Sequence, residues 1–148
     1  MDKSQALDSI EKARLAHIHQ MNQLELVLEG KKIENPTSLS KTQCDVGQWL
    51  YDEKYHLESL LGSQFYSELD AIHETWHLEY ARIYKIFFSE KKEKGLFSKL
   101  FASSKIDPLE LDKAKLYYAE LNETTQKLLC ILEKSQRRLS ALNESKFS

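Results

Sequence analysis

The sequence predicts an all-α protein, folded as an antiparallel four-helix bundle with three long helices and one short helix that carries a cysteine. Only four Gly and two Pro occur in 148 residues, which is too little turn-forming sequence for an all-β sandwich. With 41% hydrophobic and 30% charged residues, the composition is that of a folded chain rather than a disordered one. Apolar residues recur at spacings of three and four, as on one face of an amphipathic helix. We expect a single domain spanning residues 1–148.

The first helix is expected to begin near Asp2 or Ser4, either of which can cap it, and to end at Gly30. Its predicted apolar seam consists of Leu7, Ile10, Arg14, His17, Met21, Leu24 and Leu28. His17 therefore lies on the side that faces the core. His19 is rotated from it by about 200° and should face away.

A loop is predicted over residues 31–40, which contain a proline and several hydroxyl side chains. The short second helix should follow, carry Cys44 and extend to about Glu53. Within it, Gly47 would let the backbone of another segment approach closely, because glycine has no Cβ. Residues 54–63 are expected to be irregular or weakly helical.

Two further long helices are predicted, over residues 64–92 and about 107–143, with a linker at about 91–106 between them. The last helix has a strong start signal, Asp-Pro-Leu-Glu, which supplies a cap, a first-turn proline and an acid three residues after the cap. Its apolar seam is interrupted by Thr125 and Ser135.

The candidate functional residues are three histidines and one cysteine. His73 and His77 are four residues apart on one helix, so both imidazoles leave the same face and two nitrogens can reach one ion. Burying them among apolar side chains costs free energy unless hydrogen bonds or a metal satisfy the nitrogens. Taken alone, the pair of His73 and His77 is equally well explained by packing. His17 alone and Cys44 alone are better explained by packing than by metal binding. Together, three imidazoles and one thiolate form a ligand set that Zn²⁺ accepts in tetrahedral geometry.

The string Cys-x-x-Gly-x-Trp that starts at Cys44, followed by His-x-x-x-His at His73 and His77, resembles the chemoreceptor zinc-binding (CZB) domain family. The resemblance covers roughly residues 13–84, and these two motifs are its most specific part.

The first helix also resembles this family, in which a histidine precedes a Gly-ended helix terminus by thirteen residues, as His17 precedes Gly30. One departure is that the family usually has an aromatic residue three positions after this histidine, where this chain has Gln20. His19 therefore remains the alternative to His17 as the ligand from the first helix.

The resemblance implies a four-helix bundle that binds one Zn²⁺ through His17, Cys44, His73 and His77. It implies a sensory or regulatory module, often dimeric, of bacterial chemoreceptors and diguanylate cyclases. It also implies that the zinc-bound Cys44 thiolate is the reactive point, which responds to zinc availability or to oxidants such as hypochlorous acid. Zinc would keep the thiol deprotonated, and the thiolate is the form that oxidants attack.

We accordingly expect a non-enzymatic domain that takes part in signal transduction, of the chemotaxis or redox-sensing kind, through a partner chain. A homodimer is also expected, because aromatic side chains cover more than one face of their helix: Tyr80, Tyr84, Phe87 and Phe88. The apolar, lysine-flanked segment from Leu96 to Phe101 is a candidate contact for the partner.

The net charge of −2, from 21 Lys and Arg against 23 Asp and Glu, gives no reason to expect nucleic acid or a membrane surface as a partner. The sequence has no long apolar run and begins without the apolar block of a signal peptide, so we expect a cytoplasmic location. Two cysteines cannot build a disulfide framework. Cys130 is expected to pack in the core. The histidine at position 56, His56, is expected to lie in a solvated loop.

Two alternatives remain. The first is a structural or adaptor bundle without metal, in which the histidines are packing residues. The second is a zinc hydrolase, because the residues from His73 to His77 match H-E-x-x-H, where Glu74 would be the general base. A fourth ligand at Cys44 would close such a site. A di-iron site needs Glu-x-x-His on two helices plus further inward-facing Glu, a full pattern that the predicted helices do not supply.

Overall fold

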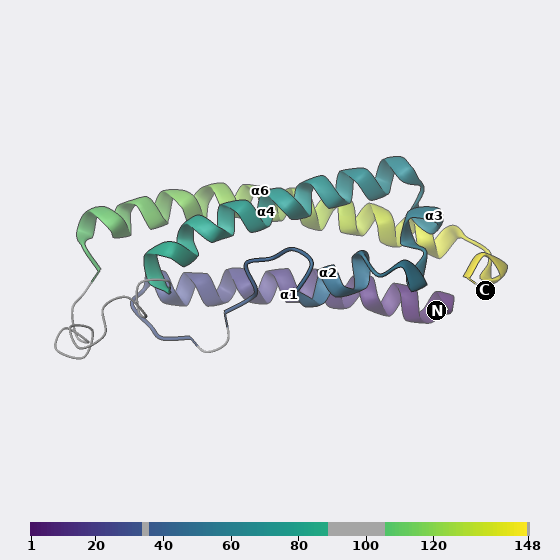
Figure 1. The fold of residues 1–148 in the computed structure, drawn as a ribbon, viewed down its shortest axis with the longest axis horizontal. Helices are drawn as coiled ribbons and strands as arrows, with labels where there is room; N and C mark the ends of the chain where they lie inside the picture. The colour runs from purple at the N-terminus through teal and green to yellow at the C-terminus, as the bar shows by residue number, and fades with distance from the viewer. Residues whose placement is uncertain (34–35, 89–105, 148) are drawn as a thin grey trace.

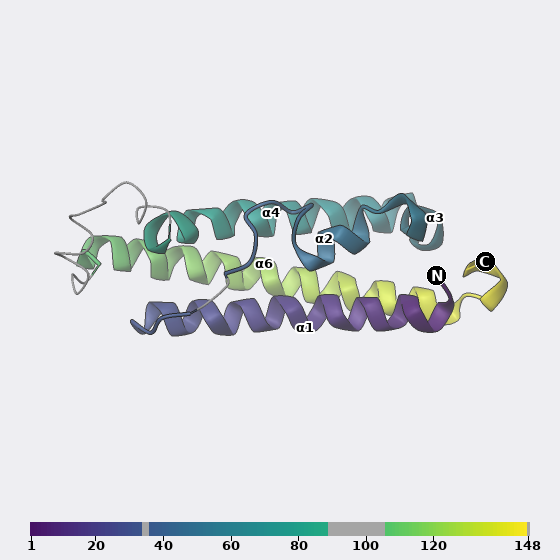
Figure 2. The same ribbon diagram turned by 60° about the horizontal axis from the view of Figure 1, so that its bottom comes forward.

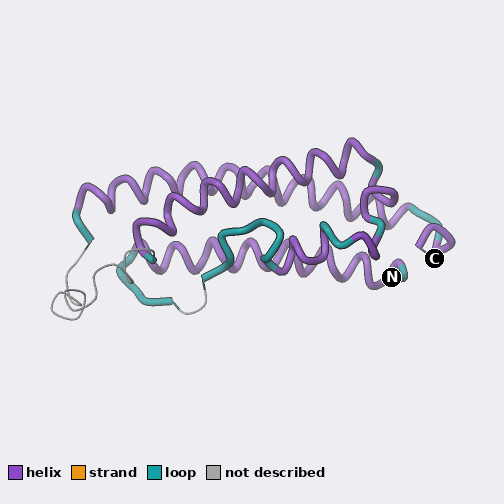
Figure 3. Tube along the Cα trace, viewed as in Figure 1, coloured by secondary structure: helices purple, strands orange, loops and turns teal. Residues whose placement is uncertain are grey.

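The computed structural model describes residues 1–33, 36–88 and 106–147. Within these residues the chain is helical and contains no strand, so the all-α prediction is confirmed (Figure 3). The long helices of the described part are α1 (Lys3–Leu28), α4 (Ser63–Phe87) and α6 (Pro108–Ala141). Its short elements are α2 (Asp45–Leu50), α3 (Leu57–Leu61) and two 3₁₀ turns, Glu53–Tyr55 and Glu144–Phe147. None of the described helices is long and apolar enough to cross a membrane.

The long helices α1 and α4 run in the same direction, and α6 runs opposite to both (Figures 1 and 2). α6 packs against α1 and α4 along their length. α4 can run parallel to α1 because the segment between them, which we call the arm (residues 36–62), carries α2 and α3 back along the molecule. An antiparallel arrangement of four helices is therefore not confirmed by the described residues, which contain three long and two short α-helices.

The ends of α1 follow the sequence prediction. The Asp2 carboxylate accepts a hydrogen bond from the Gln5 amide at 2.8 Å, and the Gln5 side chain accepts one from the Asp2 amide at 2.9 Å, which forms a capping box. Gly30 ends the helix with a φ of 88°, a conformation that glycine adopts without strain. The buried face is Ala6, Ile10, Ala13, His17, Met21, Leu24 and Val27. It is shifted slightly from the predicted seam, because small alanines rather than Arg14 lie nearest the neighbouring segments.

The described part of α4 ends at Phe87, earlier than the predicted residue 92. Its buried face combines apolar residues with both histidines: Leu69, His73, Trp76, His77, Tyr80 and Ile83. Nearly all of the predicted linker and the candidate contact from Leu96 to Phe101 lie outside the described residues.

The last long helix, α6, begins as predicted, with the Asp107 carboxylate accepting a hydrogen bond from the Leu109 amide at 2.9 Å. Thr125 and Ser135, which were predicted to interrupt the seam, are buried within it. The prediction for Cys130 was wrong: this residue is exposed, because it lies about 200° around the helix from the buried Leu128.

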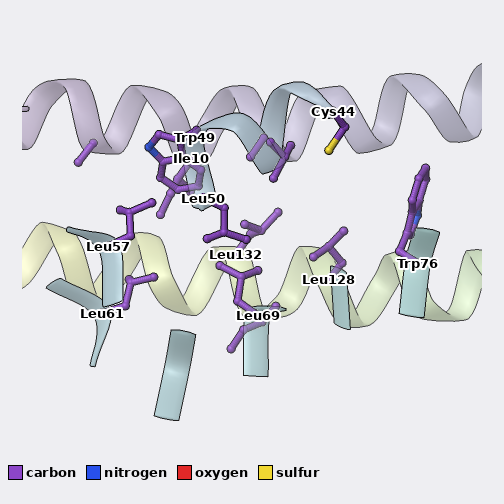
Figure 4. Close-up of a cluster of buried hydrophobic side chains, with 14 of the residues drawn as sticks. Ile10, Cys44, Trp49, Leu50, Leu57, Leu61, Leu69, Trp76, Leu128 and Leu132 are labelled. Atoms are coloured by element: carbon purple, nitrogen blue, oxygen red, sulfur yellow. The ribbon is translucent and has the colours of Figure 1, made fainter. Parts of the chain in front are cut away.

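The core joins all three long helices to the arm. Figure 4 shows its buried side chains, with Cys44 and Trp76 at one end of the cluster and Leu57 and Leu61 at the other. Leu50, Leu61, Leu69 and Leu132 are almost completely excluded from solvent. The arm is thus part of the core rather than a surface loop, which fixes the position of Cys44.

A buried hydrogen bond holds the largest fully buried side chain in place. Trp76 is fully buried, and its indole N–H donates to the Thr125 hydroxyl at 2.9 Å. Thr125→Val keeps the shape of the side chain but leaves this N–H without an acceptor, so we expect the free energy of unfolding to fall by about 1–3 kcal/mol. Urea denaturation measures the change, with Thr75→Val, on the exposed face of α4, as the control. Equal stability of the two variants would contradict the role given to Thr125.

Candidate metal centre

Three imidazoles converge between α1 and α4. His17 from α1 and His73 and His77 from α4 are buried, with 4%, 0% and 4% of their surfaces exposed. One ring nitrogen from each lies within 4.8 Å of the other two, and the Nε2 atoms of His73 and His77 are 3.2 Å apart. His19 is exposed, so of the two candidates on α1 only His17 belongs to this cluster.

The sulfur of Cys44 reaches the same cluster from the arm. Its Sγ lies 3.4 Å from His73 Nε2. Cys44 is also the N-cap residue of α2, and its Sγ accepts a hydrogen bond from the Gly47 amide at 3.2 Å. The structure thus places all four residues that were predicted as ligands close together, although they come from three separate segments of the chain.

Gly47 permits the tight turn that presents the sulfur. A Cβ at this position would lie 1.7 Å from the carbonyl oxygen of Lys41, a distance at which atoms overlap. The close backbone approach that was predicted at Gly47 is therefore confirmed. Because the Lys41 carbonyl occupies this space, the turn closes and Cys44 points toward α4.

Backbone carbonyls set the protonation of two histidines. His17 Nδ1 is 3.1 Å from the Ala13 carbonyl oxygen, and His77 Nδ1 is 3.2 Å from that of Leu39. A carbonyl oxygen only accepts hydrogen bonds, so Nδ1 carries the hydrogen in each ring. In both rings Nε2 is left with a free lone pair, which is the form in which histidine binds a metal.

The third histidine is held by a side chain. His73 Nδ1 is 3.1 Å from the hydroxyl of Tyr51, and that hydroxyl donates its own hydrogen to Asp70 Oδ1 at 2.7 Å. The Tyr51 oxygen therefore accepts from His73 Nδ1–H, and His73 Nε2 is unprotonated as well. Lys41 donates to the same carboxylate oxygen at 2.8 Å.

Burial keeps these groups neutral. It lowers the pKa of His17 to about 4 and that of His73 to about 3, and it lowers the pKa of His77 as well. Burial also raises the pKa of the Cys44 thiol. At neutral pH the cluster therefore presents three unprotonated nitrogens and one thiol, whose single hydrogen can satisfy one of the three nitrogens. The others remain unsatisfied lone pairs that face one another, an arrangement that a cation stabilises.

The spacing of these atoms fits a zinc ion. Zn–N bonds of about 2.0–2.1 Å and a Zn–S bond of about 2.3 Å, in tetrahedral geometry, place two nitrogens about 3.3 Å apart and sulfur and nitrogen about 3.6 Å apart. The corresponding distances here are 3.2 Å between His73 and His77 and 3.4 Å between Cys44 and His73. These two pairs thus already have the required spacing, and the His17 nitrogen lies within 4.8 Å of the other two ring nitrogens.

Aromatic side chains and the arm enclose the cluster. The Trp76 ring lies edge-on to the rings of His17 and His77, with centroids 4.8 and 5.0 Å apart. The hydroxyl of Tyr80 donates to the Thr37 carbonyl at 2.9 Å and so joins the arm to α4. A cavity of about 40 Å³ borders His17 and Cys44, beside Gln20, and admits only small molecules.

The hydrolase interpretation lacks its general base. Glu74 is 56% exposed, and its carboxylate lies 3.7 Å from Lys41 Nζ, outside the histidine cluster. His56 is exposed as predicted. In the described part of the chain, the cluster of His17, His73 and His77 is the group of potential ligands that converges closely enough for a metal.

Glu74→Ala should therefore leave zinc binding unchanged within about twofold, because it removes only a long, partly exposed ion pair and leaves the hydrogen bond from Lys41 to Asp70 in place. Competition with a chromophoric chelator measures the affinity. A loss of zinc, or of a hydrolytic activity present in the unsubstituted protein, would contradict this placement of Glu74.

Tyr51, Asp70 and Lys41 were not predicted as part of the site. For two of them the sequence holds a recognisable signal, which is a position close to a predicted ligand. Asp70 lies three residues before His73, and Lys41 lies three residues before Cys44. On a helix this spacing puts Asp70 on the same face as His73. Nothing in the sequence indicates that Tyr51 lies between the two.

Comparison with known protein families gives a match over residues 17–84 to the chemoreceptor zinc-binding domain family, CZB. The matched segment begins at His17 and includes Cys44, His73 and His77. The resemblance predicted from the sequence motifs is confirmed over these residues. No curated protein and no solved structure was found to match the chain.

Proposed function

We propose that this chain is a zinc-binding regulatory domain, without enzymatic activity, that holds one Zn²⁺ through His17, Cys44, His73 and His77. The observation that supports this most strongly is the convergence of three unprotonated ring nitrogens and one thiol in a buried site. Zinc, when bound, would hold Cys44 as a thiolate and link the arm to α1 and α4. The match over residues 17–84 is to a family that bears the name of this function.

The position of Cys44 supports a sensing role. It is the sole proposed ligand on the arm, whereas the histidines belong to long helices that pack on the rest of the core. Loss of its bond to zinc would therefore free the turn at Cys44 from the histidine cluster, while α1, α4 and α6 and the buried side chains of the arm stay packed. Zinc depletion has this effect, and so does an oxidant such as hypochlorous acid, which converts the thiolate to a sulfenic acid and is itself reduced to chloride.

The signal would pass to another protein. We propose a partner of the chemoreceptor or cyclase type, a homodimeric assembly and action in the cytoplasm, where thiols stay reduced. Exposed leucines on α1, the arm, α4 and α6 are available for such contacts: Leu15, Leu39, Leu78, Leu109 and Leu116.

Metal analysis of protein purified without an affinity tag tests the proposal. We expect about one zinc per chain after dialysis against metal-free buffer, and a dissociation constant that can be measured by chelator competition. Protein that takes up no zinc and has unchanged helicity by circular dichroism would support the adaptor alternative and refute the zinc function.

A further inference from the structure

We propose that Tyr51, Asp70 and Lys41 form a positioning chain that orients His73 for metal binding and couples it to the turn that carries Cys44. This inference deepens the proposed function and rests on it, but part of it is testable without metal. Its basis is a continuous series of hydrogen bonds, of 3.1, 2.7 and 2.8 Å, from His73 Nδ1 to Lys41 Nζ.

The direction of each hydrogen bond follows from the atoms involved. Lys41 has only hydrogens to give, and the Asp70 carboxylate only accepts. The Tyr51 hydroxyl has one hydrogen, which it donates to Asp70, so its oxygen accepts from His73. The chain therefore allows one tautomer of His73, with the hydrogen on Nδ1 and the lone pair on Nε2, directed at Cys44 and His77.

Electrostatics keep the chain in this state. Burial by itself would raise the pKa of Asp70, but the hydrogen bonds from Lys41 and Tyr51 outweigh it and leave that pKa below its ordinary value. Burial and the neighbouring carboxylate raise the pKa of Tyr51, so the phenol keeps its hydrogen. A histidine that donates to a carboxylate, here through a tyrosine, is a better electron donor to a metal through its other nitrogen.

Lys41 ties this chain to the second ligand. While its Nζ donates to Asp70, its own carbonyl oxygen lies 3.5 Å from Cys44 Sγ and fills the space beside Gly47. Its ammonium also lies 5.2 Å from the centre of the Tyr51 ring. One residue therefore contacts both the turn that presents the sulfur and the carboxylate that orients the imidazole.

A purely structural explanation is that these contacts only fasten the arm to α4. The protein offers a matched control that tests this structural explanation. The Tyr66 hydroxyl donates to the Leu50 carbonyl at 3.2 Å, so it also joins α4 to α2, but no hydrogen bond connects it to His73. Tyr66→Phe and Tyr51→Phe each remove one half-buried hydroxyl that joins α4 to the arm. Only Tyr51→Phe interrupts the positioning chain.

The first test uses metal-free protein and ¹⁵N NMR of the histidine rings. We expect His73 to hold its hydrogen on Nδ1 in the unsubstituted protein and in Tyr66→Phe. In Tyr51→Phe a substantial fraction should move to Nε2, because Nδ1 loses its acceptor. A His73 that carries its hydrogen on Nε2 in the unsubstituted protein, or the same tautomer in both variants, would overturn the proposal whether or not zinc binds.

The second test uses zinc affinity, with helix content monitored by circular dichroism. Tyr51→Phe and Asp70→Asn should each weaken binding, by about 10–100-fold for Tyr51→Phe, and Tyr66→Phe should change it by less than about twofold. The double variant Tyr51→Phe/Asp70→Asn should bind about as well as Tyr51→Phe, since both substitutions interrupt one chain. Equal losses in Tyr51→Phe and Tyr66→Phe, or strictly additive losses in the double variant, would refute the chain. An unsubstituted protein that binds no zinc would instead refute the proposed function.

Discussion

Replacing Cys44 by serine should weaken zinc binding by more than about 100-fold. The loss should exceed the roughly 10–100-fold loss of affinity that is typical when a residue hydrogen-bonded to a ligand is changed. The substitution removes the sulfur that lies 3.4 Å from His73 and leaves a hydroxyl that stays protonated at neutral pH and is a poor zinc ligand. Chelator competition and metal content after dialysis measure the loss. The helix content should be nearly unchanged, because the serine hydroxyl still caps α2.

Cys130→Ser is the matched control for this prediction. Cys130 is also a free cysteine, but it is exposed on α6, and we expect its replacement to leave zinc content and affinity unaltered. If both serine variants kept full zinc affinity, Cys44 would not be a ligand. If Cys130→Ser alone lost zinc, the metal would be bound elsewhere.

Gly47→Ala should have the second largest effect, because the new methyl group would lie 1.7 Å from a backbone oxygen that no side-chain rotation can move. The turn between Lys41 and Gly47 must open, which displaces the Cys44 sulfur from His73. We expect zinc affinity to fall by more than about 10-fold and the free energy of unfolding by about 1–3 kcal/mol. Chelator competition and urea denaturation measure the two effects.

Gly30→Ala separates this clash from a general cost of replacing glycine. A Cβ on Gly30 would meet nothing within 4 Å, but its φ of 88° is unfavourable for alanine. We expect Gly30→Ala to cost about 1 kcal/mol of stability and to leave zinc affinity intact. Zinc binding by Gly47→Ala that equals that of Gly30→Ala would show that the turn does not set the position of Cys44.

Features fixed by local sequence were predictable. The cap at Asp107 and the stop at Gly30 depend on hydrogen bonds or dihedral angles within a few residues, and the sequence shows them directly. The inward position of His17 followed from helical periodicity. The identity of the buried neighbours did not, because a period of 3.6 residues fixes the face of a helix but not what packs on it.

The features that the sequence did not show depend on contacts between distant segments. Thr125 interrupts the apolar seam of α6 in the sequence, but in the structure it is the acceptor for the Trp76 indole on another helix. Tyr51 joins His73 and Asp70 across 22 and 19 residues. The parallel course of α1 and α4 depends on how the arm packs into the core, which no local pattern specifies.

Anomalous scattering from crystals of the tag-free protein, measured on both sides of the zinc absorption edge, tests the central claim most directly. We predict one strong peak per chain among His17, Cys44, His73 and His77, about 2.3 Å from the sulfur and about 2.0–2.1 Å from each nitrogen. A zinc peak at a site that excludes the Cys44 sulfur, or no peak in protein grown with zinc, would contradict it.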